Sequence, residues 1–113
     1  MMMRALADAI NGPANYAWVI TKDHLAQSGD QSDVGTMGPH DAPTELVERL
    51  NAGEGATFRM YDDDQILYYT GRALSVDDEW DERACFGPLD DFGMPNAGAV
   101  WIKWHGHPER DNG

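Results

Sequence analysis

Cysteine and long apolar runs are almost absent from this sequence. Cys85 is the only cysteine among 113 residues, which excludes an internal disulfide and a zinc cluster built from thiolates alone. A single free thiol fits a reducing cytoplasmic compartment. No apolar run approaches the roughly 20 residues that cross a bilayer, and Asp8 falls too early for a good secretory signal. We therefore expect a cytoplasmic protein without membrane contact.

Positive charge is also scarce. Eight Lys and Arg oppose twenty Asp and Glu, which gives a formal net charge of −12. This charge disfavours direct binding to nucleic acid or anionic lipid and favours a protein partner with a basic surface. The alternative is that the carboxylates serve only solubility. Intrinsic disorder does not fit, because four Trp, four Tyr and three Phe can supply a core.

Residues 57–72 predict a β-hairpin around which the remaining chain is organised. Two runs rich in aromatic and β-branched residues flank the polar cluster Asp62, Asp63, Asp64 and Gln65, and each run alternates between two faces. The turn contains neither Asn-Gly nor Asp-Gly, which favours a loop of about three to five residues over a two-residue turn. The three aspartates repel one another and are expected to stay in water.

Further strands are predicted at residues 16–21, 34–38 and 99–104, and a helix is predicted to begin near Asp41. Asp41 is the expected cap, Glu45 suits the positive helix start, and Leu46 and Leu50 share one face. Residues 75–82 fit either a short helix or a loop held by Trp80, and residues 86–98 have the composition of a loop.

The expected fold class is α+β, a mainly antiparallel sheet of four to five short strands with one helix packed on it. The length fits a single domain over residues 1–113. Within it, the lead-in over residues 1–14 and the polar tail over residues 105–113 are predicted to be mobile.

Motifs of the common enzyme classes are missing. The chain has no phosphate-binding glycine loop and no serine elbow, and the tripeptide at residues 91–93 lacks the other kinase motifs. Cys85 could act as a nucleophile with His24, His40 or His105 as the base. Its neighbours, Ala84 and Phe86, instead suggest a small buried residue. We expect no enzymatic activity and no catalytic residues.

Carboxylates and histidines offer two candidate metal sites. The first combines residues 62–64 with Asp90 and Asp91, whose oxygens suit Ca²⁺ or Mg²⁺, but the EF-hand loop pattern is absent. The second is the pair His105 and His107, which would need further ligands from elsewhere. Neither pattern predicts a dedicated site, so we expect no metal and no cofactor.

Half of the acidic residues fall between positions 62 and 91, and we take them as the candidate partner-binding set. Carboxylates two residues apart on a strand would lie about 6.6 Å apart and could imitate successive phosphates, as in inhibitors of DNA-binding proteins. The set is Asp62, Asp63, Asp64, Asp77, Asp78, Glu79, Asp81, Glu82, Asp90 and Asp91.

Aromatic residues form a further candidate surface. Tyr68, Tyr69, Trp101 and Trp104 lie on predicted strands, where alternation sends some of them outward unless both faces of the sheet are covered. An outward Tyr or Trp is a common interface anchor. Whether these side chains are exposed is left open, and so is a homodimer through an edge strand.

Short turn-and-strand motifs give the chain a resemblance to small, uncharacterised acidic proteins of actinobacteria, their plasmids and their phages. The motifs are WVITKDH at residues 18–24, VGTMGP at 34–39, FRMYDDD at 58–64, LYYTGR at 67–72, FGPLDDFG at 86–93 and PNAG at 95–98. The resemblance implies a mobile-element origin and carries no activity or site residues with it.

These observations favour a non-enzymatic protein that binds a basic surface of a host macromolecule, as an inhibitor or DNA mimic. A nucleic-acid-binding host protein would be such a partner. If a phage encodes the chain, we expect the protein to act in the host cytoplasm. The alternative is a small-ligand or metal-binding domain.

Overall fold

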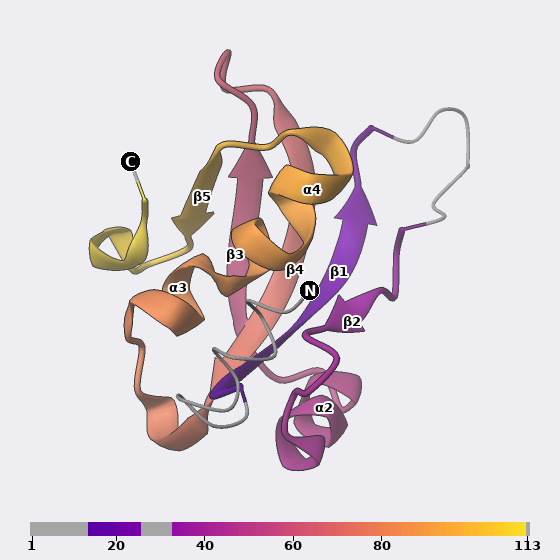
Figure 1. Cartoon of the computed structure of the whole chain (residues 1–113), viewed down its shortest axis with the longest axis vertical. Coiled ribbons are helices and arrows are strands. Elements are labelled where there is room, and N and C mark those ends of the chain that lie inside the picture. Colours follow the sequence, from indigo (N-terminus) through magenta and orange to yellow (C-terminus); the bar gives the residue numbers. More distant parts are fainter. Residues whose placement is uncertain (1–13, 26–32, 113) are drawn as a thin grey trace, which may run out of the picture.

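A five-stranded antiparallel sheet forms the centre of the protein (Figure 1). The structure is a computed structural model that describes residues 14–25 and 33–112. The strands are β1 (Tyr16–Asp23), β2 (Met37–Gly38), β3 (Ala56–Tyr61), β4 (Leu67–Ser75) and β5 (Trp101–Trp104), in the spatial order β2-β1-β4-β3-β5. The predicted α+β class with a mainly antiparallel sheet is confirmed.

The predicted hairpin is β3 and β4 with a five-residue loop between them. Asp62 closes this loop, because its Oδ1 accepts hydrogen bonds from the backbone amides of Asp64, at 2.9 Å, and Ile66, at 2.8 Å. Gln65 adopts a positive φ of 63°. Asp63 and Asp64 are exposed, as their mutual repulsion requires.

The first face of the sheet carries most of the large side chains. Tyr16, Trp18 and Ile20 of β1 lie there with Phe58 and Met60 of β3, all buried. A layer of short helices covers them: α3 (Glu82–Pro88), the π-helical turn η2 (Leu89–Gly93) and α4 (Met94–Ala97).

The prediction of a loop over residues 86–98 is therefore wrong. Asp81 caps α3 by accepting a hydrogen bond from the amide of Ala84, and Gly98, with φ of 76°, ends the run. Between them, Leu89 and Phe92 are buried against the sheet. This burial outweighs the low helix propensity of the glycines and prolines in the run.

The second face is covered at one end by α2 (Thr44–Asn51), whose Leu46 and Leu50 pack on Ala17 and Val19 of β1. The helix predicted around these leucines is confirmed, and Glu45 lies in its first turn. The predicted cap is wrong: the N-cap position is Pro43, and no side chain caps the helix. The helix starts too far from Asp41 for that role, so its stability comes from packing.

Trp80 anchors the segment between β4 and α3. Its ring meets that of Trp104 edge-on, with centroids 5.0 Å apart, and the Arg110 guanidinium lies 4.4 Å from its centroid. Only the turn η1 (Val76–Asp78) is helical before α3 begins. Of the two predicted alternatives, the loop held by Trp80 is the one observed.

Residues after β5 turn back along the edge of the sheet. The 3-10 helix η3 (Pro108–Arg110) brings Asp111 and Asn112 beside β5. Their side-chain oxygens accept hydrogen bonds from the amides of Trp104, at 2.7 Å, and Ile102, at 2.6 Å. These contacts place the described part of residues 105–113 beside the sheet, and the mobility expected of this tail stays a prediction. Of the predicted lead-in, only Ala14, which is buried, lies within the described residues.

Strand β1 is interior, as its two apolar faces predict, whereas the strand predicted over residues 34–38 is limited to Met37 and Gly38.

Among the described residues, no helix has the length and apolar character needed to cross a bilayer.

Close packing of α3 on β1 gives a first test. A Cβ atom at Gly87 would lie 2.2 Å from Cε2 of Tyr16, so Gly87→Ala must push the helix away from the sheet. We expect a loss of about 1–3 kcal/mol in the free energy of unfolding, measured by urea denaturation. Glu82→Ala, in the exposed first turn of the same helix, should change it by less than about 0.5 kcal/mol. Equal effects of the two substitutions would contradict the packing argument.

Candidate functional site: a groove beside Asp90 and Asp91

A groove of about 740 Å³ runs between β2 and the helical layer on the first face of the sheet. Its size falls in the range of ligand-binding clefts, roughly 300–1,000 Å³. Residues from three separate segments line it: Trp18 from β1; Thr36, Met37, Gly38, Pro39 and His40 from β2 and its flanks; and Asp90, Asp91, Phe92, Pro95 and Asn96 from η2 and α4.

Two aromatic rings underlie this groove. Trp18 and Phe92 are almost completely buried, and their ring centroids are 5.4 Å apart with planes tilted by 51°. Gly38 allows β2 to lie directly on the indole, because a Cβ there would come within 2.4 Å of Cζ2 of Trp18. His40 and Asn96 are exposed at the rim.

Asp91 holds the helical layer to the sheet. Its Oδ2 accepts a hydrogen bond of 2.6 Å from the Tyr16 hydroxyl and one of 3.0 Å from the Trp18 indole N–H. Both donors project from β1, so a single carboxylate joins η2 to the central strands. Asp91 therefore has a structural role in addition to any contact with a partner.

Asp90, its neighbour, is exposed and has a perturbed pKa. Partial burial raises the pKa of Asp90 above its usual value, and the nearby carboxylates of Asp91 and Glu82 raise it further. Like charges this close disfavour the ionised form. A cation in the groove would relieve that repulsion, so the site is electrostatically suited to a positive group.

The ten predicted partner-binding residues do not share one surface. Asp62, Asp63 and Asp64 lie at the hairpin tip, at one end of the molecule, and the segment with Asp77, Asp78, Glu79, Asp81 and Glu82 lies at the other (Figure 1). None of the ten is on a strand, so the regular strand spacing expected of a phosphate mimic does not apply. Seven of the ten fall within residues 76–91, where Arg83 is the only basic residue.

Several of these acids already have partners within the fold. Asp78 accepts a hydrogen bond from the Trp80 indole, and Asp81 caps α3 and accepts one from the Asn15 side chain. Asp77 and Asp78 both have positive φ values, of 55° and 56°. Asp tolerates this conformation better than most residues.

The aspartates at the hairpin tip are the only described residues that bring three potential metal-ligand atoms together, within 4.8 Å of one another. Asp62 is engaged in closing the loop, and Asp63 and Asp64 are exposed. The other predicted ligands, Asp90 and Asp91, lie on η2 instead. His107 contacts Glu109, with Nδ1 3.2 Å from Oε2.

Cys85 does not have the surroundings of a nucleophile. It is buried, its thiol donates to the Trp80 carbonyl at 3.4 Å, and burial raises its pKa. An activated thiol needs a lowered pKa and access to solvent. The interpretation of Cys85 as a small core residue is confirmed.

Sequence reasoning identified Asp90 and Asp91 but missed the other wall of the groove. Met37, Pro39 and His40 follow a loop far from η2 in sequence, and only the pairing of β2 with β1 brings them opposite it. One sequence signal for the groove is the run from Leu89 to Phe92, in which two aspartates stand between two apolar residues. In a helix, Leu89 and Phe92 would share a buried face and the two carboxylates would lie at its edge.

Comparisons with protein-family models, with curated proteins and with solved structures find no match. The resemblance to small acidic proteins of actinobacteria and their mobile elements therefore stays a prediction.

The different roles of Asp90 and Asp91 can be tested by stability. Asp91→Ala leaves the Tyr16 hydroxyl and the Trp18 indole without their common acceptor, so we expect a loss of roughly 1–3 kcal/mol in the free energy of unfolding. Asp90→Ala should leave the stability at pH 7 unchanged or slightly higher, because it removes like-charge repulsion. Urea denaturation of both variants measures the difference. Comparable losses in the two variants would refute the assignment.

Proposed function

We propose that the protein is a non-enzymatic binding protein whose groove receives a basic side chain from another macromolecule. The observation that carries this proposal is the position of Asp90, an exposed carboxylate of raised pKa that lines the groove. Within the described residues, no Lys or Arg forms an ion pair with it. An arginine or lysine of a partner would supply the missing positive charge.

The groove offers two kinds of contact for such a side chain. The carboxylate of Asp90 can accept hydrogen bonds from a guanidinium or ammonium group, and Pro95, which is exposed, and Met37, which is half-buried, line the groove and offer apolar surface to its methylene stem. Asn96 and His40 at the rim add polar contacts for the adjacent backbone. Arginine suits the site better than lysine, because its planar fork matches a carboxylate.

Negative charge near the groove is increased by Glu82, the last residue of the acidic segment 76–82. The charge of Glu82 raises the pKa of Asp90, so its negative field reaches the groove. A basic partner would be steered towards the groove at a rate that falls with ionic strength. The net charge of −12 adds to this attraction.

Several finer features belong to the same proposal. A nucleic-acid-binding protein of a host cell is a partner with the required basic surface, and occupation of that surface would make the protein an inhibitor. Cytoplasmic action and a mobile-element origin fit this role. A small cationic ligand is the second candidate, because the volume of the groove would hold one.

Binding experiments with charge-matched variants test the proposal. The natural chain should retain basic proteins from a host lysate at low salt and release them at high salt, and bind an arginine-containing peptide in calorimetry. We expect Asp90→Asn to weaken peptide binding at least about tenfold, which corresponds to roughly 1.4 kcal/mol. Asp63→Asn, which removes the same charge at the hairpin tip, should weaken it by less than about twofold.

Equal losses for Asp90→Asn and Asp63→Asn would show that only net charge matters and would remove the groove from the proposal. Failure to retain any basic protein from the lysate would end the partner hypothesis. Binding of putrescine, a small diamine, more tightly than the peptide would favour the small-ligand alternative.

The raised pKa of Asp90 predicts a specific pH dependence. The positive group binds the ionised carboxylate, so peptide affinity should fall as the pH drops through the pKa of Asp90 in the free protein. Because that pKa is raised, the fall should begin at a higher pH than for an ordinary aspartate. Titrations are best made with His40→Gln, which removes the imidazole charge at the rim. The further substitution Asp90→Asn should flatten the profile over this range, and an unchanged profile would contradict the assignment.

A further inference from the structure

The second face of the sheet is only partly covered. Helix α2 packs over Ala17 and Val19, and it extends as far as Arg72, whose guanidinium donates hydrogen bonds to the carbonyls of Leu50 and Glu54. Beyond Arg72, towards the hairpin tip, the side chains of Lys22, Arg59 and Lys103 on this face are exposed. The remaining part is an open surface formed by β1, β4, β3 and β5.

A row of basic residues crosses this open surface. Backbone pairing aligns Lys22 with Thr70, Thr70 with Arg59, and Arg59 with Lys103. Directly paired residues lie on the same side of a sheet, so these four side chains share the open face. The three basic side chains are exposed, and strand spacing of about 4.8 Å gives the row a length of roughly 14 Å.

These cations are uncompensated within the described residues, where none of the three forms an ion pair. Their field reaches His24, whose Nε2 lies 2.9 Å from the Thr70 hydroxyl on the same face. Burial is the main cause that lowers the pKa of His24, and the charges of Lys22 and Arg59 lower it further, although Asp23 opposes them. A locally positive surface is therefore present on a protein of strongly negative net charge.

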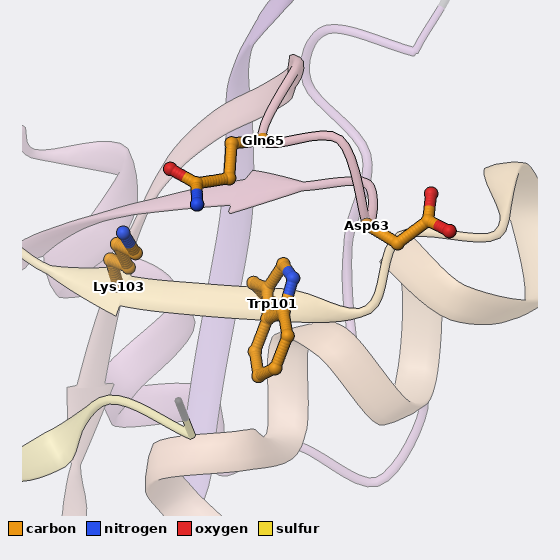
Figure 2. A pocket seen from close by; sticks show the side chains of 4 residues that line it. All are labelled: Asp63, Gln65, Trp101 and Lys103. Carbon is orange, nitrogen blue, oxygen red and sulfur yellow. The ribbon is translucent and has the colours of Figure 1, made fainter.

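Aromatic side chains border the row. Tyr61 pairs with Trp101 in the next register position, both rings are half-buried, and Nζ of Lys103 lies 5.4 Å from the centroid of Tyr61. A cleft of about 170 Å³ is lined by Asp63, Gln65, Trp101 and Lys103. In Figure 2, Trp101 and Lys103 are neighbours along β5, while the Asp63 carboxylate points away from Lys103.

We propose that this face, the basic row together with Tyr61 and Trp101, binds an acidic, extended segment of a partner protein. Carboxylates of the segment would meet Lys22, Arg59 and Lys103, and an apolar side chain would pack on Trp101. About four extended residues span the row. This surface is distinct from the groove beside Asp90, on the opposite face of the sheet, and the proposal does not depend on the groove.

Two observations select this occupant. Addition of the segment as a sixth strand on β5 is blocked, because Asp111 and Asn112 already bond the amides of Trp104 and Ile102. A long nucleic acid fits poorly, because three cations neutralise few phosphates and the aspartates of the hairpin tip border the face. A short acidic peptide meets both conditions, because it can lie on the face without extending the sheet and needs only a few cations.

Peptide titrations followed by amide chemical shifts test the proposal. The probe is an eight-residue glutamate-rich peptide with one central phenylalanine, added to the full chain at low salt. We expect shift changes on β3, β4 and β5 around Arg59 and Lys103, and Arg59→Gln or Lys103→Gln should weaken binding at least about fivefold. Arg49→Gln, the same charge change on α2, should weaken it by less than about twofold. Trp101→Ala should also weaken binding. The natural chain should bind the same peptide less tightly at high salt.

Four results would overturn this assignment. The first is no binding of the acidic peptide at about 1 mM. The second is an equal loss for Arg49→Gln and Arg59→Gln, which would show an effect of net charge alone. The third is tighter binding of oligothymidylate of the same charge on the same residues, which would make the face a nucleic-acid surface. Shift changes confined to residues around Asp90 would likewise exclude the open face.

Discussion

The two hydrogen bonds that Asp91 accepts from Tyr16 and Trp18 are the constraint on which the arrangement of the molecule depends. They connect the helical layer to the interior strand β1 by a charged acceptor, and such bonds are stronger than those between neutral groups. Phe92 follows directly and packs on Trp18 and Tyr69. The same turn that buries Phe92 therefore presents Asp90 to solvent, so the groove is a consequence of how the core closes.

The protein has an uneven distribution of charge across its sheet. The helical layer and the turn before it carry seven acids and a single arginine, whereas the open part of the opposite face presents Lys22, Arg59 and Lys103. A sheet with one covered and one partly open face makes this possible, because alternate residues of each strand point in opposite directions. The two proposed binding surfaces are separated by the thickness of the sheet, so both could be occupied at once.

The sequence predicted the parts of the fold that depend on local patterns. Alternation in residues 57–72 predicted β3 and β4, and the spacing of Leu46 and Leu50 predicted α2. It did not predict helix over residues 82–97, because Gly87, Pro88, Gly93 and Pro95 argue locally for a loop. Burial of Leu89 and Phe92, which depends on residues more than sixty positions earlier, decided the outcome. The cap predicted at Asp41 also failed, because α2 begins at Thr44 and its N-cap position is Pro43.

For the site, composition identified the acidic residues but not their positions relative to one another. Residues 62–64 and 77–82 are close in sequence, yet β4 separates them by its full length. The opposite wall of the groove and the basic row arise from strand pairing, which links Lys22 to Arg59 and Lys103 across distant segments. Net charge alone conceals such a row.

The side chains of Asp111 and Asn112 have a consequence for the solubility of the folded chain. An unpaired strand edge invites other chains to extend the sheet, which is the first step towards fibrous aggregates. Here the side chains of Asp111 and Asn112 bind the outward amides of β5, so these amides are not free to pair with a further strand. Without these two side chains, the amides of Ile102 and Trp104 would be free to pair with another chain. The turn over residues 108–112 thus limits the sheet at β5.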